Sequence, residues 1–109
     1  MNFDPQDAII GPEKLKDYLL SPLHMAGRQK AAFFSSLGYS RESWETLEKD
    51  IRSLLVAAAE PVKPTEYGQK YAVRGSLKGP NGREARIVTI WIILTGETSP
   101  RLVTAYPND

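Results

Sequence analysis

REARIVTIWIILT, residues 83–95, is the stretch that decides the fold class of this chain. β-branched and aromatic side chains dominate it, which is typical of a strand. Alternate residues of a strand point to opposite faces, and here both sets are largely apolar. Such a strand lies inside a sheet, so we predict that this one is central. The two sets are Val88, Ile90, Ile92 and Leu94, and Ile87, Thr89, Trp91 and Ile93.

Two further strands flank this one, at residues 69–77 (QKYAVRGSL) and 101–107 (RLVTAYP). The residues between them supply turn chemistry, GPNG at 79–82 and the segment 96–100, so the three strands should form antiparallel hairpins. A fourth strand could come from residues 8–10 or from residues 62–67.

The outer strands alternate between polar and apolar side chains. In the first, Lys70 and Arg74 share a face that should avoid the core. In the last, Val103 and Ala105 suit the helix-packed face, which leaves Leu102, Thr104 and Tyr106 on the opposite side, near Thr89 and Trp91. We therefore expect an open sheet face that is polar, cationic and partly aromatic.

The residues before the strands have helical periodicity. A first helix is predicted over residues 12–20, after Gly11 and Pro12. A second should follow Ser21 and stop at Gly38, and a third should run from 41 to about 60. Lys30 lies inside the apolar arc of the second helix. The fold class is therefore α+β: three N-terminal helices packed on a C-terminal antiparallel sheet of three to four strands.

A chain of 109 residues is the size of one domain, here 1–109, with a helical half at about 12–60 and a sheet half at about 68–107. Residues 1–60 carry a net charge of −2 and residues 61–109 one of +3, so the sheet half could attract phosphates. The chain has no cysteine, no signal-peptide pattern and no apolar run long enough to span a bilayer, and we expect a cytoplasmic protein.

Several kinds of chemistry find no support in the sequence. One histidine and no cysteine cannot build the usual transition-metal site in a monomer, and we expect neither a metal nor another cofactor. Carboxylate-only magnesium binding stays a weak alternative. The sequence contains neither a glycine-rich phosphate-binding motif between a strand and a helix nor the G-x-S-x-G motif of a nucleophile elbow.

His24 is the sharpest catalytic candidate, since histidine titrates near neutral pH. Arg28 lies one helical turn later and could hold a phosphate beside it. Alternatively, both are ordinary surface residues at the start of the helix.

Four strand residues complete the candidate site. Lys70 and Arg74 could contact phosphate, although basic residues also protect exposed strands from edge-to-edge pairing. Tyr106 could donate a proton or stack on a base, and Thr104 could hydrogen-bond a phosphate, although both residue types are common in strands.

Two segments, KLKDYLLSPLHMAGRQKAAFFSSLGYSRESWETLE (14–48) and YAVRGSLKGPNGREARIVTIWII with PRLVTAYP (71–93 and 100–107), carry a resemblance. They resemble a family of small uncharacterised bacterial domains with a histidine–glycine–arginine–lysine-alanine helix and a terminal leucine-valine-threonine-alanine-tyrosine-proline strand. That family resembles, more distantly, the barnase, EndoU, colicin and RelE group of metal-independent ribonucleases, in which helices precede a four-stranded antiparallel sheet.

The resemblance implies a ribonuclease-like toxin that acts on RNA and is held by a cognate antitoxin or immunity protein. His24 and Tyr106 would then exchange protons with the substrate, and Arg28, Lys70, Arg74 and Thr104 would bind it. A noncatalytic binding module, such as an antitoxin, an immunity protein or an inactive toxin relative, is the alternative. A small DNA-binding protein is less favoured, because no helix carries clustered basic residues.

Overall fold

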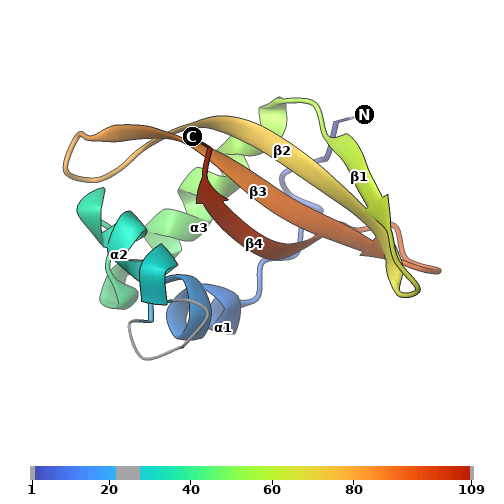
Figure 1. Cartoon of the computed structure of the whole chain (residues 1–109), viewed down its shortest axis with the longest axis horizontal. Coiled ribbons are helices and arrows are strands. Elements are labelled where there is room, and N and C mark those ends of the chain that lie inside the picture. Colours follow the sequence, from blue (N-terminus) through green and yellow to red (C-terminus); the bar gives the residue numbers. More distant parts are fainter. Residues whose placement is uncertain (1, 22–27, 109) are drawn as a thin grey trace.

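The computed structural model describes residues 2–21 and 28–108, and its elements follow the predicted order of helices before strands (Figure 1). The helical elements are α1 (Pro12–Lys14) with its continuation η1 (Leu15–Leu19), α2 (Arg28–Ser36), η2 (Arg41–Ser43), α3 (Trp44–Ser53) and η3 (Leu54–Val56). The strands are β1 (Glu60–Pro64), β2 (Gly68–Lys78), β3 (Glu84–Leu94) and β4 (Arg101–Pro107). The α+β class is confirmed.

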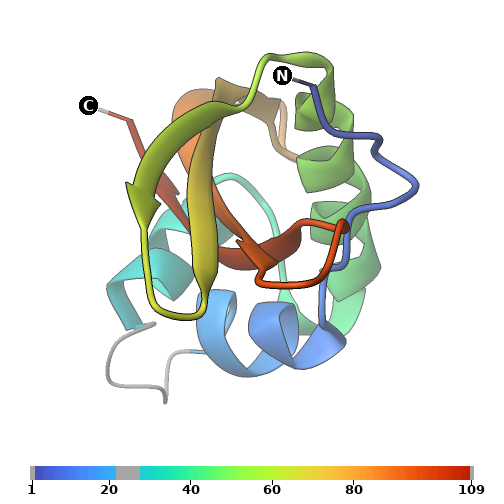
Figure 2. The same cartoon turned by 90° about the vertical axis from the view of Figure 1, so that its right-hand side faces the viewer.

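The four strands form one antiparallel sheet in the order β1-β2-β3-β4, so β3 is an internal strand as predicted. Helix α3 and the N-terminal segment cover one face of the sheet, and η1 and α2 lie beside β4 (Figures 1 and 2). We call the face turned away from α3 the outer face.

The helical elements end and the strands begin earlier than the approximate bounds expected from the sequence. The helical half ends at Val56 instead of residue 60, and the sheet half begins at Glu60 instead of residue 68. The fourth strand, β1, overlaps the predicted segment at 62–67, whereas the segment at 8–10 contributes only a parallel bridge from Ile9 to Arg101. Prolines are tolerated in β1 because it is an edge strand.

The core lies between the helices and the inner face of the sheet. Trp91 of β3 is fully buried there, and its indole Nε1 donates to Thr89 Oγ1 at 2.8 Å. The Thr89 hydroxyl in turn donates to the Val73 carbonyl at 2.9 Å, which satisfies both polar groups. The fully buried helical residues are Leu15, Leu19, Phe34, Leu47, Ile51 and Leu55.

The predicted register of the last strand was wrong. A bulge between the pairs Ile90↔Thr104 and Trp91↔Leu102 inserts Val103 as an extra residue. Leu102 is therefore buried in the core, and Thr104 and Tyr106 pair with Ile90 and Val88 instead of lying near Thr89 and Trp91. A bulge that depends on packing against the helices leaves no period-two signal in the sequence.

Tyr39 links the end of α2 to α3, since its hydroxyl donates to Asp50 Oδ2 at 2.6 Å. Burial is the main cause that raises the pKa of Tyr39 above its ordinary value of 10.0, and the Asp50 carboxylate raises it further. The folded state therefore holds this proton more tightly than the unfolded state. The stabilisation is fully present below pH 10 and is lost as the pH rises above it.

We predict that the free energy of unfolding of the wild-type protein falls as the pH rises above 10 and that Tyr39→Phe makes this fall shallower. At pH 8 the variant should be about 1 kcal/mol less stable, because it lacks the hydrogen bond to Asp50. Urea unfolding at pH 8 and at pH 11 measures both effects. Equal alkaline losses in the two proteins would contradict the assignment.

Candidate functional site

The two helical candidates are only partly visible. His24 lies outside the described residues, and so does the side chain of Arg28, although its backbone begins α2. The placement of this pair relative to the strands therefore stays a prediction. The other four candidates lie on the sheet and can be located.

Lys70, Arg74, Thr104 and Tyr106 all belong to the outer face, but β3 separates them into two groups. Arg74 and Tyr106 both pair with Val88, from opposite sides, so their backbones are about 10 Å apart. Val88 is buried between them, and the next outer-face residues of β3, Ile90 and Ile92, are apolar as well. The outer face is thus polar on β2 and β4 and apolar along β3, where both sides of the strand were expected to be largely apolar.

The two basic residues on β2 differ in their surroundings. Arg74 forms an exposed ion pair with Glu60 of β1, in which Nη1 and Oε1 are 3.1 Å apart. Lys70 is half-buried, four residues away on the same face. A phosphate bound at Arg74 would have to compete with the Glu60 carboxylate.

A group of polar and charged side chains lies where η1 and α2 meet β4. The Tyr18 hydroxyl of η1 and Thr104 Oγ1 of β4 are 3.3 Å apart, within hydrogen-bond distance. Lys14 Nζ lies 5.3 Å from the centre of the Tyr18 ring, and Lys30 Nζ lies 5.6 Å from it. We call Lys14, Tyr18, Lys30 and Thr104 the tyrosine–lysine cluster.

The cluster favours negative charge. The hydrogen bond with Thr104 is the largest cause that lowers the pKa of Tyr18, and the ammonium groups of Lys30 and Lys14 lower it further against an opposing effect of burial. A phenol in this setting gives up its proton more readily than a solvent-exposed tyrosine. The same positive field would attract an anionic ligand.

A small pocket of about 190 Å³ adjoins the cluster. Gln29, Lys30 and Phe33 of α2 line it together with Tyr106 and Pro107 of β4. Lys30 belongs both to this pocket and to the tyrosine–lysine cluster, so the two features are continuous. Thr104 and Tyr106, the latter 39% exposed, are the sequence-predicted residues that the structure brings into this corner.

Sequence reasoning missed Tyr18, Lys14 and Lys30 as site residues. Two signals could have found them. Lys14 and Tyr18 are four residues apart on one helix, which places them on one face. Lys30 interrupts the apolar arc of its helix, and a charged residue at such a position indicates a special environment.

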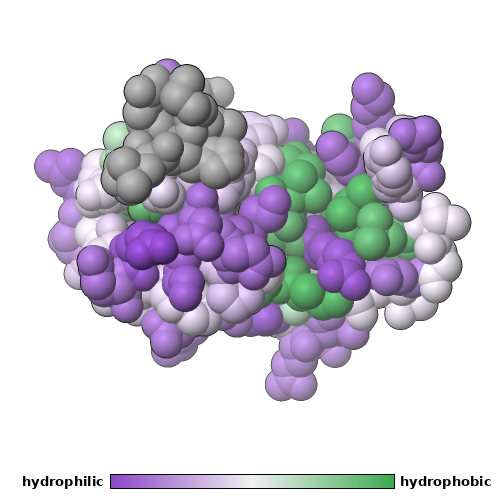
Figure 3. All heavy atoms as spheres, turned by 90° about the horizontal axis from the view of Figure 1, so that it is seen from below, coloured by the Kyte–Doolittle hydropathy of each residue, from purple (hydrophilic) through white to green (hydrophobic). Residues whose placement is uncertain are grey.

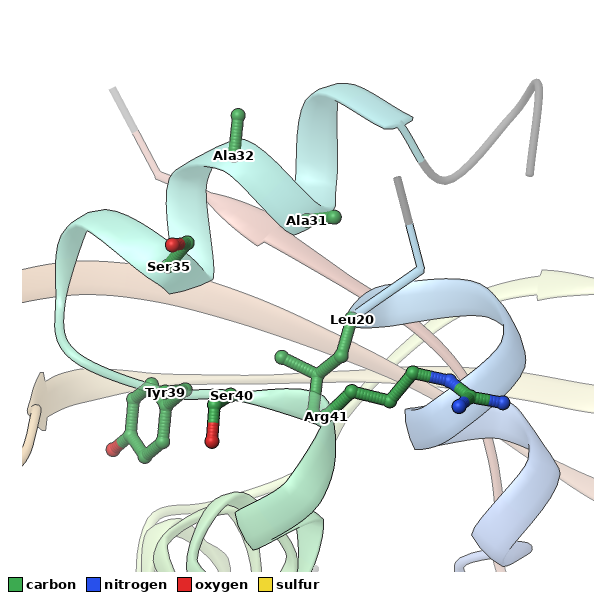
Figure 4. A pocket seen from close by; sticks show the side chains of 7 residues that line it. All are labelled: Leu20, Ala31, Ala32, Ser35, Tyr39, Ser40 and Arg41. Atoms are coloured by element: carbon green, nitrogen blue, oxygen red, sulfur yellow. The ribbon is translucent and has the colours of Figure 1, made fainter. Parts of the chain in front are cut away.

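A larger pocket of about 430 Å³ lies elsewhere (Figure 4). Its guanidinium group, from Arg41, already bonds Asp17 at 2.8 Å and the Lys16 carbonyl at 3.0 Å. The Tyr39 hydroxyl donates to Asp50. This pocket is therefore a mainly apolar hollow in which the Arg41 guanidinium and the Tyr39 hydroxyl already have partners. Its lining residues are Leu20, Ala31, Ala32, Ser35, Tyr39, Ser40 and Arg41.

Hydrophobic residues also reach the surface, and Figure 3 shows them gathered among hydrophilic ones on the face seen from below. The large hydrophobic residues that are exposed in the described ranges are Ile9, Val56, Val62, Tyr67 and Tyr106.

Within residues 2–21 and 28–108, no group of three or more His, Asp or Glu side chains could hold a metal ion. No helix in the same ranges is long and apolar enough to cross a membrane.

Comparison with solved structures finds the same fold in a chain of the contact-dependent growth inhibition toxin–immunity protein complex from Klebsiella pneumoniae 342. The TM-score is 0.72, the sequence identity is 16%, and the match covers 97% of each chain. The matched chain can be either the toxin or the immunity protein, and the likeness shows the fold alone. It agrees, at that level, with the resemblance to toxin domains.

No curated protein matches the sequence. A match to a domain of unknown function extends over residues 3–109, nearly the whole chain. The chain therefore belongs to the DUF6883 family.

Proposed function

We propose that this chain is the toxin member of a toxin–immunity pair and that it cleaves RNA without a metal ion. The observation that carries the proposal is the corner between η1, α2 and β4. Two ammonium groups, a phenol of lowered pKa and the Thr104 hydroxyl meet there, next to the Tyr106 ring. The shared fold with a chain of a toxin–immunity complex supports it.

The proposed reaction is attack of a ribose 2′-oxygen on the adjacent phosphorus. A general base takes the 2′-hydroxyl proton, the new O2′–P bond forms, and the P–O5′ bond breaks. A general acid protonates the leaving 5′-oxygen, so the products are a 2′,3′-cyclic phosphate and a 5′-hydroxyl. His24 and Tyr106 are the proposed acid–base pair, since both can carry a transferable proton.

Cationic groups stabilise the charge that develops on the phosphoryl oxygens. Thr104 and Tyr106 are two residues apart on β4, so their backbones are about 7 Å apart and both can face one phosphate group. Arg28 would bind the same phosphate. Lys70 and Arg74, on the other side of β3, would hold a neighbouring part of the RNA chain.

A noncatalytic protein-binding module, such as an antitoxin, an immunity protein or an inactive relative, is the second candidate. The solved neighbour favours it as well, because a chain of a toxin–immunity complex has a protein partner whichever member it is. The ion pair that occupies Arg74 also fits a surface that does not bind phosphate.

Induced expression in a bacterial host separates the two functions. We predict growth arrest with loss of intact cellular RNA, and relief of the arrest by His24→Ala. Purified protein should cleave RNA in the presence of a chelator, and His24→Ala should lower the cleavage rate at least about 100-fold, the usual contribution of acid–base catalysis.

Tyr106→Phe tests the second proton-transfer group, and Tyr67→Phe is its matched control. Tyr67 is also exposed, but lies in the connection between β1 and β2. The Tyr106 variant should lose activity, and the Tyr67 variant should keep it. Normal growth and intact RNA with a folded, abundant wild-type protein would instead support the binding module.

A further inference from the structure

We infer that the corner between η1, α2 and β4 is a subsite for one nucleotide of a single-stranded nucleic acid. Its base would enter the pocket beside Phe33 and Tyr106, and its phosphate would contact Lys14 and Lys30. The inference rests on the proposed function and names the part of the substrate that this site recognises. It does not depend on which residues carry out the chemistry.

The charge arrangement points to an anion. The ammonium groups of Lys14 and Lys30 both lie within 6 Å of the centre of one ring, that of Tyr18, so positive charge gathers around this side chain. Within residues 2–21 and 28–108, the ion pairs engage four arginines instead: Arg41, Arg52, Arg74 and Arg101. A bound phosphate would supply the negative charge that these two lysines lack.

The hydrogen-bonding groups fit the same ligand. The hydroxyl groups of Tyr18 and Thr104 lie 3.3 Å apart, and either can be the donor. The Thr104 hydroxyl can accept a hydrogen bond from Tyr18 while it donates to a phosphate oxygen, so the pair remains linked when the ligand binds. The positive field around Tyr18, seen in its lowered pKa, acts on a ligand anion in the same direction.

The pocket itself suits a flat ring. Its volume of about 190 Å³ is below the range of about 300–1,000 Å³ typical of drug-sized ligands, so it fits a single ring system. Phe33 comes from α2 and Tyr106 from β4, which provides aromatic surface from two elements. Proteins that bind single-stranded nucleic acid stack its unpaired bases on aromatic side chains and contact its phosphates with nearby basic residues.

Binding can be measured without cleavage. A fluorescently labelled 2′-O-methyl oligoribonucleotide has no free 2′-hydroxyl and cannot undergo the proposed reaction. Fluorescence anisotropy should show saturable binding by the wild-type protein. Lys30→Gln should weaken it about tenfold and reduce the slope of log K against log salt by roughly one phosphate contact. Phe33→Leu, which keeps an apolar side chain against Phe34, should also weaken it about tenfold.

Lys63→Gln is the matched control for charge. Lys63 is an exposed lysine on the edge strand β1, outside the proposed subsite. The binding constant of the Lys63→Gln variant for the oligonucleotide should stay within about twofold of the wild-type value. Circular dichroism should show that all variants are folded. The inference is overturned if no binding is measurable, or if Lys30→Gln and Phe33→Leu bind as tightly as Lys63→Gln.

The two proposals fail in different ways. A protein that binds the oligonucleotide through Lys30 and Phe33, yet leaves cellular RNA intact, keeps the subsite and loses the nuclease. A protein that degrades RNA while these variants bind normally keeps the nuclease and loses the subsite.

Discussion

Replacing Trp91 with alanine is expected to lower the free energy of unfolding by about 3–5 kcal/mol, because it removes the largest fully buried side chain of the core. The ring packs edge-on against Phe3, with ring centres 6.4 Å apart, and Leu102 of β4 is the cross-strand partner of Trp91. No small rearrangement of a paired central strand fills the space left by an indole. The free energy of unfolding of a domain of this size is about 5–15 kcal/mol, so the substitution would remove much of its stability.

Urea unfolding monitored by circular dichroism measures this loss, and Trp44→Ala is the control. Trp44 is the other tryptophan of the chain; it is only half-buried, and Lys16 Nζ lies 5.8 Å from its ring centre. Its removal should cost about 1–2 kcal/mol, since much of the ring already contacts water. Equal costs for both substitutions would show that the core is not centred on β3.

Replacing Gly79 with alanine is expected to cost about 3 kcal/mol, at the upper end of what overpacking costs. Gly79 begins the β2–β3 turn, where the backbone approaches the end of α2, and an added Cβ would overlap the Leu37 carbonyl oxygen. The turn is tied to this helix end, because Asn81 donates from Nδ2 to the Ser36 carbonyl at 3.0 Å. Because the nearest obstacle is the Leu37 backbone, no side-chain rotation can make space for the methyl group.

Gly82→Ala in the same turn tests backbone strain without the steric overlap that an added methyl group causes at Gly79. An added Cβ at Gly82 would meet nothing within 4 Å, but φ is +88°, in the left-handed region that favours glycine. The expected cost is about 1 kcal/mol, from backbone strain alone. Thermal unfolding should rank Gly79→Ala well below Gly82→Ala in stability. The reverse order would mean that the hairpin does not dock on α2.

Much of the fold could be read from the sequence because its signals are local. The two apolar faces of residues 87–94 identified the internal strand, and the turn residues around Gly82 and Gly96 placed the connections, where both glycines have positive φ. β1 escaped a firm prediction because two of its five residues are prolines, Pro61 and Pro64, and its side chains are all exposed. A short edge strand carries almost no hydrophobic period.

The candidate site could be predicted only in part. Residue type identified Thr104 and Tyr106, but the sequence suggested Lys70 and Arg74 as their partners, whereas the neighbours found are Tyr18 and Lys30. Tyr18 and Thr104 are 86 positions apart in the chain, and no periodicity connects them. Which polar groups meet is settled by how η1 and α2 pack beside β4.

The sequence by itself determined the order of helices before strands and the internal position of β3, since these follow from side-chain patterns within about ten residues. Only the tertiary structure decided the bulge at Val103 and the meeting of Lys14, Tyr18 and Lys30 with β4. The physical reason is that register and docking depend on the fit between surfaces distant in the chain. A change of one residue in register would turn Thr104 away from Tyr18.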